Sequence, residues 1–386
     1  MMRPAINGCL LVLVSLAGLA ACGSDPVPDV TNDSRARTPI DALSQPDDDD
    51  SIDSFKVATK PADIRFPRDH GAHPEFRTEW WYFTGNLEAE DHRHFGFQLT
   101  FFRYALNATP AERESAWAAN QVWMAHFTVT DSEAEQFFAE ERFSRDAFEL
   151  AGATASPFRV WLSDWQATGS DDDLTPMRVS AATDNVGLNL VLDSNKPIVL
   201  QGDGGFDVKG PEPGNASYYY SLTRMPATGT LRIGKQEHPV SGDAWMDREW
   251  STSALSAGLA GWDWFGLQLD DGTELMLYRL RGKDGTTSPF SGGSLVSPEG
   301  TVTRLTAEDI EVRVIDQWQS PSTDTVYPVA WQVTVPDEAI NLYVVPAVMQ
   351  QELDLTVRYW EGAVFVAGQS GARDIEGHGY LELVGY

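Results

Sequence analysis

Short aromatic and aliphatic runs divided by turn signals constrain this sequence more than any other feature. Runs rich in Val, Phe, Tyr and Trp are separated by dipeptides such as Asp271-Gly272 and by the glycine-rich segment 202–205. This spacing is typical of antiparallel strands joined by tight turns. Helical signals are confined to residues 111–120 and 144–150. The sequence therefore predicts an all-β fold of barrel or sandwich type with few short helices.

An internal repeat indicates two related units. The two segments are 80–88 (WWYFTGNLE) and 262–270 (WDWFGLQLD). Both follow the pattern Trp, any residue, aromatic, Phe, any two residues, amide, Leu, acid. In each case a turn and a second strand come next. Chance similarity is the alternative, because hairpins share composition. We favour two antiparallel barrels, over 63–240 and 241–386, each large enough to hold one small ligand. A polar, turn-like segment at 234–239 marks the expected boundary.

Residues 1–21 have the pattern of a secretory signal peptide. Arg3 supplies the positive charge, residues 10–19 form the apolar core, and Leu-Ala-Ala precedes Cys22. Residues 19–22, Leu-Ala-Ala-Cys, resemble a bacterial lipobox, which implies that Cys22 becomes the lipidated N-terminus of the mature protein. The alternative is that a Cys stands at this position by coincidence. Because Cys9 would leave with the signal, no disulfide is expected.

The following segment, 22–62, is expected to be a flexible acidic tether. It is rich in Asp, Pro, Ser and Thr, with four Asp at 47–50. About 40 such residues reach roughly 35 Å, enough to hold a folded body clear of a bilayer. We expect the periplasmic face of the bacterial envelope, at the outer rather than the inner membrane, because Gly23 is not the Asp that commonly signals inner-membrane retention. The formal charge of −29 disfavours nucleic acid as a partner.

Residues 241–269 combine tryptophans with carboxylates at an unusual density. A buried indole still needs a partner for its N–H, so Trp alternating with acids is typical of an apolar cavity wall that carries fixed polar groups. Ordinary barrel strands with inward Trp and outward acids are the alternative. The residues expected to contact a ligand are Trp245, Arg248, Trp262, Trp264, Trp80, Tyr82 and Tyr220.

Other polar residues allow two interpretations each. His126 shares a strand face with Val122 and Met124, and is either a core His satisfied by an acid or a proton-handling cavity residue. Tyr220 belongs either to a structural ladder or to a ligand site. His70 and His73 lie near carboxylates, but their spacing matches no metal site, so we expect no metal and interpret them as caps of the first strand.

Several enzyme classes lack their motifs here. No nucleophile elbow, phosphate-binding loop or dinucleotide-binding glycine pattern occurs in the right context. What remains is acid–base chemistry by carboxylates, His and Tyr, or no chemistry.

Several motifs, in order along residues 66–386, resemble the AttH family, which is related to the carotenoid 1,2-hydratases (hydroxyneurosporene synthases). The resemblance implies a tandem of two lipocalin-like β-barrels, in agreement with the internal repeat. The motifs are EWWYFTGNL at 79–87, YYYS at 218–221, GDAWMDREW at 242–250, GWDWFGLQLDDG at 261–272, YPVAW at 327–331, YWEGAV at 359–364 and GHGYLELVGY at 377–386.

In the hydratase branch, the resemblance implies addition of water across the terminal C1=C2 bond of an acyclic carotenoid without a redox cofactor. Such a reaction needs an acid, an aromatic face for the cation and a base. Trp250 is the expected cation stabiliser, and the expected proton carriers are Asp247, Glu249, Tyr278 and His126.

This sequence departs from the hydratases at two positions. Arg248 stands where they carry His, and Leu280 where they carry an acidic residue. Arginine stays protonated and cannot donate to carbon. Arg248 flanked by Asp247 and Glu249 is therefore also interpreted as part of a buried ion-pair network at the domain interface.

Three functional hypotheses follow. The first is a lipid-anchored envelope protein that binds a long hydrophobic ligand, a carotenoid, isoprenoid or acyl lipid, in a lipocalin-like cavity. The second is a hydratase acting on a terminal alkene. The third is a non-catalytic accessory lipoprotein of an ABC-type envelope transporter.

Overall fold

The computed structural model describes residues 55–109, 119–170, 173–252, 255–256 and 258–386. The expected signal peptide, Cys22, most of the tether and nearly all of the helix at 111–120 lie outside these residues. Among the described residues, no helix is long and apolar enough to cross a membrane.

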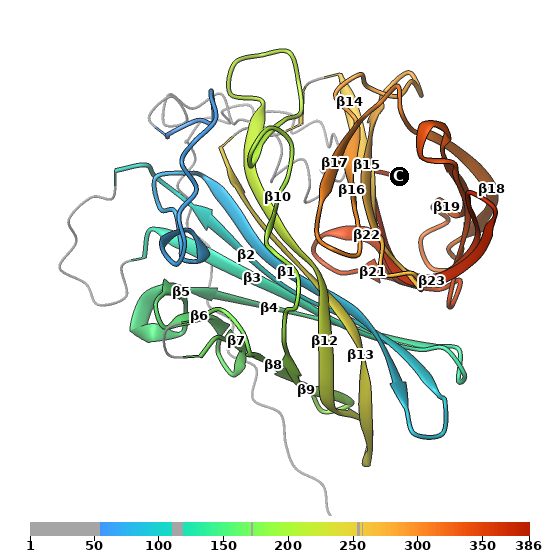
Figure 1. The fold of residues 1–386 in the computed structure, drawn as a ribbon. Coiled ribbons are helices and arrows are strands. Elements are labelled where there is room, and N and C mark those ends of the chain that lie inside the picture. The colour runs from blue at the N-terminus through green and yellow to red at the C-terminus, as the bar shows by residue number, and fades with distance from the viewer. Residues whose placement is uncertain (1–54, 110–118, 171–172, 253–254, 257) are drawn as a thin grey trace, which may run out of the picture. The chain divides into compact units, whose positions relative to one another are not determined.

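The first half of the described chain forms one antiparallel sheet of thirteen strands (Figure 1). The strand order is β4-β3-β2-β1-β13-β12-β9-β8-β7-β6-β5, with β10 and β11 paired to β12. The sheet curls into a half-barrel. Its strands are β1 (Thr78–Ala89), β2 (His94–Ala105), β3 (Gln121–Asp131), β4 (Gln136–Arg145), β5 (Ala151–Ala155), β6 (Phe158–Leu162), β7 (Trp165–Thr168), β8 (Met177–Ala182), β9 (Val186–Leu192), β10 (Val199–Leu200), β11 (Phe206–Val208), β12 (Ala216–Ile233) and β13 (Gln236–Ser251).

The second half forms a sheet of ten strands that curls into a nearly closed barrel (Figure 1). The order is β17-β16-β15-β14-β23-β22-β20-β19-β18, with β21 paired to β22. The expected all-β fold with two antiparallel units is thus confirmed. The strands are β14 (Leu259–Leu269), β15 (Glu274–Gly282), β16 (Gly292–Val296), β17 (Val302–Thr306), β18 (Glu311–Gln319), β19 (Val326–Val335), β20 (Ile340–Pro346), β21 (Glu352–Asp354), β22 (Arg358–Ser370) and β23 (Arg373–Val384).

The expected helix at 144–150 is wrong. Strand β4 continues to Arg145, which pairs with Val122 of β3, and only a 3₁₀ turn, Ala147–Glu149, follows. Two similar turns, Arg68–His70 and Pro336–Glu338, are the other helical elements of the described chain. Pairing with a neighbouring strand overrides a local helical preference of this size.

The expected boundary between residues 240 and 241 falls inside strand β13. This strand pairs with β12 and β1 up to Ser251, so the chain leaves the first sheet only between Ser251 and Leu259. The polar segment at 234–239 contains the two-residue hairpin turn 234–235, with Gly234 at φ 58°, and the first four residues of β13, which pair with β12. A turn signal shows where the chain reverses, but it does not show whether the next strand stays in the same sheet.

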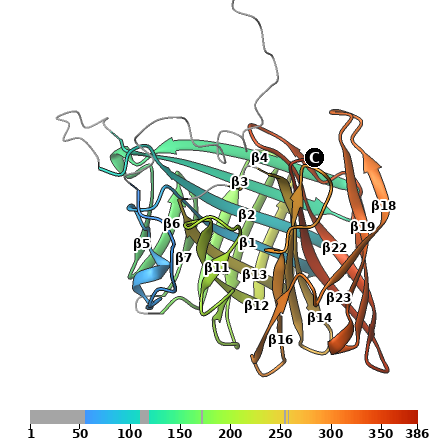
Figure 2. The same ribbon diagram turned by 90° about the horizontal axis from the view of Figure 1, so that it is seen from above.

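The two sheets pack face to face mainly through β1 and β2 of the first and β22 and β23 of the second, and β12 also contacts β14. Figures 1 and 2 show β22 and β23 beside β1 and β2. In β1, Trp81 and Phe83 enter the core of the first sheet, whereas Tyr82 packs in a separate cluster with Trp264 of the second. Since both faces of β1 are covered, its burial does not alternate as it would in a strand with one solvated face.

The repeated segments take equivalent places in their sheets. Strand β1 lies between β13 and β2, and β14 lies between β23 and β15. Tyr82 is therefore opposite Asp247, and Trp264 is opposite Glu382. Each sheet thus presents an aromatic residue next to a carboxyl group toward the other sheet.

We predict that Gly96→Ala destabilises the packing of the two sheets. A Cβ on Gly96 would lie 2.5 Å from the Cβ of Ala363 in β22, and neither group can move aside without shifting a strand. Overpacking of this kind costs about 1–3 kcal/mol of unfolding free energy, measurable by urea denaturation.

Gly187→Ala in β9 is the matched control. Its nearest contact would be the guanidinium of Arg232, at 3.3 Å, a side chain that needs to move by only a few tenths of an ångström. We expect no loss of stability there, because Ala is favoured over Gly inside a strand by roughly 0.5–1 kcal/mol. Equal effects of the two substitutions would contradict close packing at Gly96.

Candidate active site

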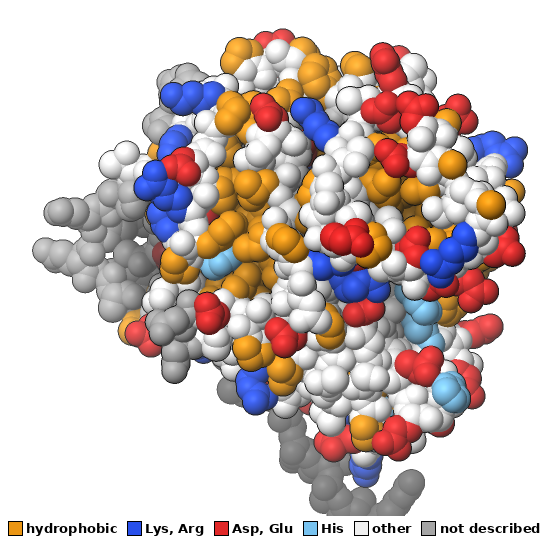
Figure 3. Space-filling model, in the orientation of Figure 1, with side chains coloured by type: hydrophobic (Ala, Val, Ile, Leu, Met, Phe, Trp, Pro, Cys, Tyr) orange, Lys and Arg blue, Asp and Glu red, His pale blue; other side chains and the backbone are white. Residues whose placement is uncertain are grey.

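A cavity of about 200 Å³ lies between the two sheets. Trp80 and Phe102 of the first sheet and Trp262 of the second are partly exposed in its wall, so the cavity has an open side. Hydrophobic side chains gather in hollows on the face shown in Figure 3. The aromatic and aliphatic lining residues are Trp80, Tyr82, Phe102, Tyr104, Tyr219, Leu255, Trp262, Trp264, Tyr278 and Leu280.

Most residues expected to contact a ligand are part of this cavity. Trp80, Tyr82, Trp262 and Trp264 line it. Trp245 lies behind the wall, where its indole N–H donates to Asp247 at 2.7 Å and its ring packs edge-on against Trp264. Both repeated hairpins therefore contribute to the cavity wall, together with residues of β12, β13 and β23.

Asp247 is the most strongly hydrogen-bonded acid of the cavity. Its Oδ2 accepts from the phenol of Tyr219 at 2.6 Å, and its Oδ1 accepts from Ser221 at 2.5 Å as well as from Trp245. Burial raises the pKa of Asp247 to about 7, although the three donors act in the opposite direction. A carboxylate has about four acceptor positions, so one remains for a molecule in the cavity.

Two other residues expected to transfer protons, Glu249 and Tyr278, also line the cavity. Glu249 forms an ion pair with Lys209, and Tyr278 donates to Asp207 Oδ1 at 2.7 Å. Lys209 Nζ lies 5.5 Å from the ring centroids of both Tyr219 and Tyr278. Lys209 is the only Lys or Arg among the described lining residues.

A further carboxyl group, Glu382, enters the cavity from the second sheet. It accepts a hydrogen bond from the indole of Trp262 and lies opposite Glu361 of β22. Glu361 is fully buried and accepts from the phenol of Tyr82 at 2.7 Å. The cavity thus holds or adjoins five carboxyl groups, Asp207, Asp247, Glu249, Glu361 and Glu382.

Three expected site residues lie on the other face of the first sheet, because side chains alternate along a strand. Trp250, Arg248 and Tyr220 belong to the core of the first sheet, on the opposite face from Asp247 and Glu249. The proposed grouping of Trp250 with these two acids in one site is therefore wrong. In the tyrosine run it is Tyr219, and not Tyr220, that reaches the cavity.

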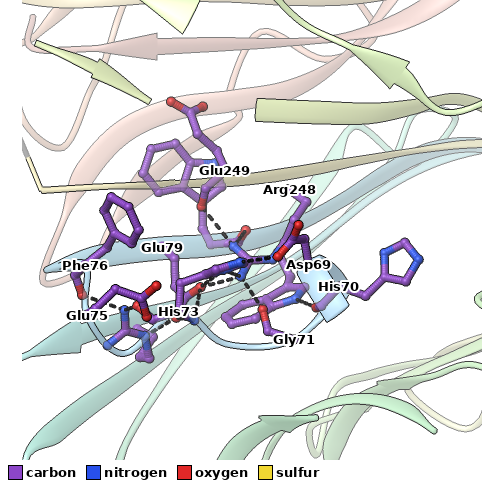
Figure 4. Close-up of polar contacts among 12 residues, drawn as sticks. Asp69, His70, Gly71, His73, Glu75, Phe76, Glu79, Arg248 and Glu249 are labelled. Carbon is purple, nitrogen blue, oxygen red and sulfur yellow. Dashed lines mark hydrogen bonds and ion pairs between the residues drawn. The ribbon is translucent and has the colours of Figure 1, made fainter. Parts of the chain in front are cut away.

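Arg248 belongs to a buried ion cluster with Glu79 (Figure 4). It also donates to the carbonyl of Gly71 at 2.6 Å, and Arg103 forms the second ion pair of Glu79. The interpretation of Arg248 as a buried ion-pair residue is therefore right. Its partner is Glu79, however, and the network lies within the first sheet rather than with Asp247 and Glu249 at the interface.

The cluster holds the segment before β1 in place. His73 stacks on Trp250 with ring centroids 4.0 Å apart and contacts Asp69 and Glu79, while His70 lies 2.7 Å from the phenol of Tyr220. Burial and the charge of Arg248 lower the pKa of His70 to about 4.

Among the described residues, no group of His, Cys, Asp and Glu has the arrangement of a metal site.

His126 lies beside the cavity and does not line it. Its Nδ1 is 2.7 Å from the phenol of Tyr359, and its Nε2 is 3.6 Å from Glu141. Burial lowers the pKa of His126, with Glu141 acting in the opposite direction. His126 is therefore a buried core His whose hydrogen bond goes to a phenol, while Glu141 lies too far away to form one, so the expected satisfaction by a neighbouring acid is not seen.

Sequence reasoning missed Lys209, Asp207 and the two acids of the second sheet. Lys209 follows the short strand β11, where no periodic pattern points to a face. Glu361 lies in the motif YWEGAV and Glu382 in the motif GHGYLELVGY, both outside the internal repeat. The equivalence of Glu382 with Asp247 is visible only in the strand pairing, which the sequence does not contain.

Two curled antiparallel sheets with an aromatic, acidic cavity between them define a class of tandem lipocalin-like proteins. The chain belongs to the AttH-like family, whose model matches residues 57–386. The solved structure of an AttH protein from Nitrosomonas europaea is 34% identical, with a TM-score of 0.76 over 86% of this chain and 100% of that chain. The resemblance seen in the sequence is thereby confirmed.

Proteins named as hydratases and dehydratases are also similar. Kievitone hydratase from Nectria haematococca matches with a TM-score of 0.65 over 86% of this chain and 98% of that chain, at 14% identity, which shows the fold alone. Dehydratase asqC of Emericella nidulans is 25% identical over 56% of this chain, and kievitone hydratase of Fusarium solani subsp. phaseoli is 21% identical over 55%. The matches span 63% and 61% of these two relatives.

We predict that Glu79→Gln destabilises the first sheet strongly. It leaves the guanidinium groups of Arg103 and Arg248, both fully buried, without their shared carboxylate. Breaking a buried ion pair costs about 3–5 kcal/mol, measurable by urea unfolding followed by tryptophan fluorescence.

The same ion pairs make the stability depend on pH. Burial alone would raise the pKa of Glu79, but the charges of Arg248 and Arg103 outweigh it and hold this pKa below its usual range. The contribution of Glu79 is therefore present above about pH 4.5 and is lost as the pH falls further.

Glu75→Gln is the control. Glu75 forms an exposed pair with Lys56 at 3.6 Å, and its loss should change stability by less than about 1 kcal/mol. A change of similar size for both variants would show that Glu79 does not hold this cluster together.

Proposed function

We propose that this protein is an acid–base enzyme that adds water to, or removes it from, an apolar substrate held between the two sheets. The observation that carries this proposal is Asp247, an acid with a pKa of about 7 in the wall of an aromatic cavity. A general base works best when its pKa lies near the working pH. The hydratase and dehydratase relatives support the same reaction class.

The substrate class follows from the walls of the cavity. Apolar rings from both hairpins suit a long hydrophobic molecule such as a carotenoid, isoprenoid or acyl lipid. Trp262 and Trp264, rather than Trp250, offer ring faces toward a cation formed in the cavity. We propose that Asp247 takes the proton of the attacking water, with Tyr219 and Ser221 holding the carboxylate in place.

Binding of the hydrophobic molecule without chemistry is the second candidate. It is favoured by the two positions, Arg248 and Leu280, at which this chain differs from the carotenoid hydratases. Arg248 faces away from the cavity, and Leu280 lines it as an apolar group. The two candidates are separated by incubating the protein with acyclic carotenoid or isoprenoid alkenes in ¹⁸O-labelled water. Incorporation of ¹⁸O into an alcohol supports the enzyme, whereas saturable binding with no incorporation supports a binding protein.

The cellular setting is part of the proposal. We propose that Cys22 is lipidated and that the segment 22–62 tethers the folded body on the periplasmic face of a bacterial envelope, at the outer membrane. The small-residue motif before Cys22 and the acidic, Pro-rich composition of the segment support this setting. A role beside an ABC-type transporter would fit the same location.

We predict that Asp247→Asn lowers kcat by about 10²–10⁴-fold while ligand affinity stays nearly unchanged. Because an ionised Asp247 is required, the kcat of the parent should fall as the pH drops below about 7. The raised pKa also means that the parent loses stability as the pH rises from about 4 to 7, a loss that the Asn variant should not show. Kinetics and urea unfolding across this range measure both effects.

Asp243→Asn is the control for this prediction. Asp243 lies on the same strand, pairs with Arg224 at 2.9 Å and does not line the cavity. Its variant should keep the kcat and the pH profile of the parent. If Asp247→Asn turns over at the rate of the parent, Asp247 is not the base.

We predict that Cys22→Ser releases the protein from membranes. Without the thiol, no diacylglycerol can be attached, and the variant should appear in the soluble fraction without incorporating labelled palmitate. Cys9→Ser is the control and should stay membrane-bound, because residue 9 lies within the expected signal peptide. A Cys22→Ser protein that still carries the label would rule out this anchor.

A further inference from the structure

Two acidic side chains of the second sheet face each other beside the cavity. Glu361 of β22 and Glu382 of β23 are direct cross-strand partners in the antiparallel pair. Cβ atoms of such partners lie about 4.5–5.5 Å apart, and like charges at this separation repel. Glu361 is fully buried, while Glu382 reaches the cavity wall.

Neither acid has a cationic partner within the described chain. Glu361 accepts from Tyr82 and Glu382 accepts from Trp262, and both donors are neutral. Oε2 of Glu361 is buried and has no donor from any other described residue, so a proton held between the two carboxyl groups is what can satisfy it. Two carboxyl groups in this position cannot both be ionised.

Neighbouring groups do not change this balance. The phenols of Tyr359 and Tyr380 are neutral, because burial raises the pKa of each far above its usual value. Lys209, the cation that acts on Glu382, is itself paired with Glu249. Burial and the charge of Glu382 raise the pKa of Glu361 well above its usual range, and burial also raises the pKa of Glu382.

We propose that Glu361 and Glu382 share one proton and that Glu382 is the acid that protonates the substrate, opposite Asp247 as the base. This inference rests on the proposed function and supplies the proton donor that it lacks. The acid comes from the second sheet and the base from the first.

The geometry places the two groups on either side of an aromatic floor. Tyr82, opposite Asp247, and Trp264, opposite Glu382, meet edge-on with ring centroids 5.3 Å apart. A substrate lying over these rings would have the acid on one side and the base on the other. Neither sheet alone contains both groups.

The proposed step balances. The O–H bond of Glu382 breaks, and the π electrons of the alkene form a C–H bond at the less substituted carbon. The resulting tertiary cation accepts a lone pair of water to form the C–O bond, and Asp247 takes the released proton. One water is added in total, and exchange with solvent through the open side of the cavity returns Glu382 and Asp247 to their starting states. Dehydration is the same sequence in reverse.

The shared proton can be tested in the resting protein by infrared spectroscopy. At about pH 8, above the pKa of Asp247, the parent should show the carbonyl stretch of a protonated carboxylic acid. The double variant Glu361→Gln/Glu382→Gln should lose the intensity of one such group, and Asp247→Asn should keep it. Parent and double variant with equal intensity would overturn the shared proton.

Donation to substrate is tested separately by turnover. Glu382→Gln should lower kcat by about 10²–10⁴-fold with ligand affinity, measured by tryptophan fluorescence, nearly unchanged. Glu376→Gln, at an exposed position of the same strand, is the control and should behave as the parent does. A Glu382→Gln variant as fast as the parent overturns Glu382 as the acid.

The failure of this inference and that of the proposed function look different. If the parent adds water to an alkene and Glu382→Gln does so equally well, only the acid is misassigned. If the parent neither adds nor removes water, the proposed function and the donation step both fall, while the infrared band still decides whether the pair shares a proton.

Discussion

The face-to-face packing of the two sheets is the interaction on which the rest of the structure depends. It covers the second face of β1, β12 and β13, which would otherwise expose Tyr82, Tyr219 and Trp245 to water. Hydrogen bonds such as that from the Asn86 amide to the Gly379 carbonyl, at 3.0 Å, fix the register of the two sheets. Because the contact is incomplete, it leaves a cavity whose two walls belong to different sheets.

Charge is distributed unevenly across strand β13. On one face, Arg248 is neutralised by Glu79 within the closed core of the first sheet. On the other face, Asp247 and Glu249 meet a single cation, Lys209. The first face belongs to a paired ion cluster that stabilises the segment before β1, and the second has more acids than cations. An excess of buried acids holds protons near neutral pH, which is a property that acid–base chemistry requires.

The chain belongs to the AttH-like family, which the sequence motifs related to the carotenoid 1,2-hydratases. The position at which the carotenoid hydratases carry His is occupied here by Arg248, whose side chain faces away from the cavity. Its charge therefore does not act on a substrate there. The acids that do face the cavity come from both sheets, so the charge of the cavity depends on the interface rather than on one motif.

The sequence by itself determined the fold class, the two related units and most of the aromatic cavity wall. Alternating strands and a repeated hairpin are local patterns, and they place Trp80, Tyr82, Trp262 and Trp264 without reference to distant residues. Only the tertiary structure decided which face of β13 meets the cavity, that Tyr219 rather than Tyr220 reaches it, and that Glu361 and Glu382 are neighbours. A two-residue periodicity separates the faces of a strand but does not say what covers each one.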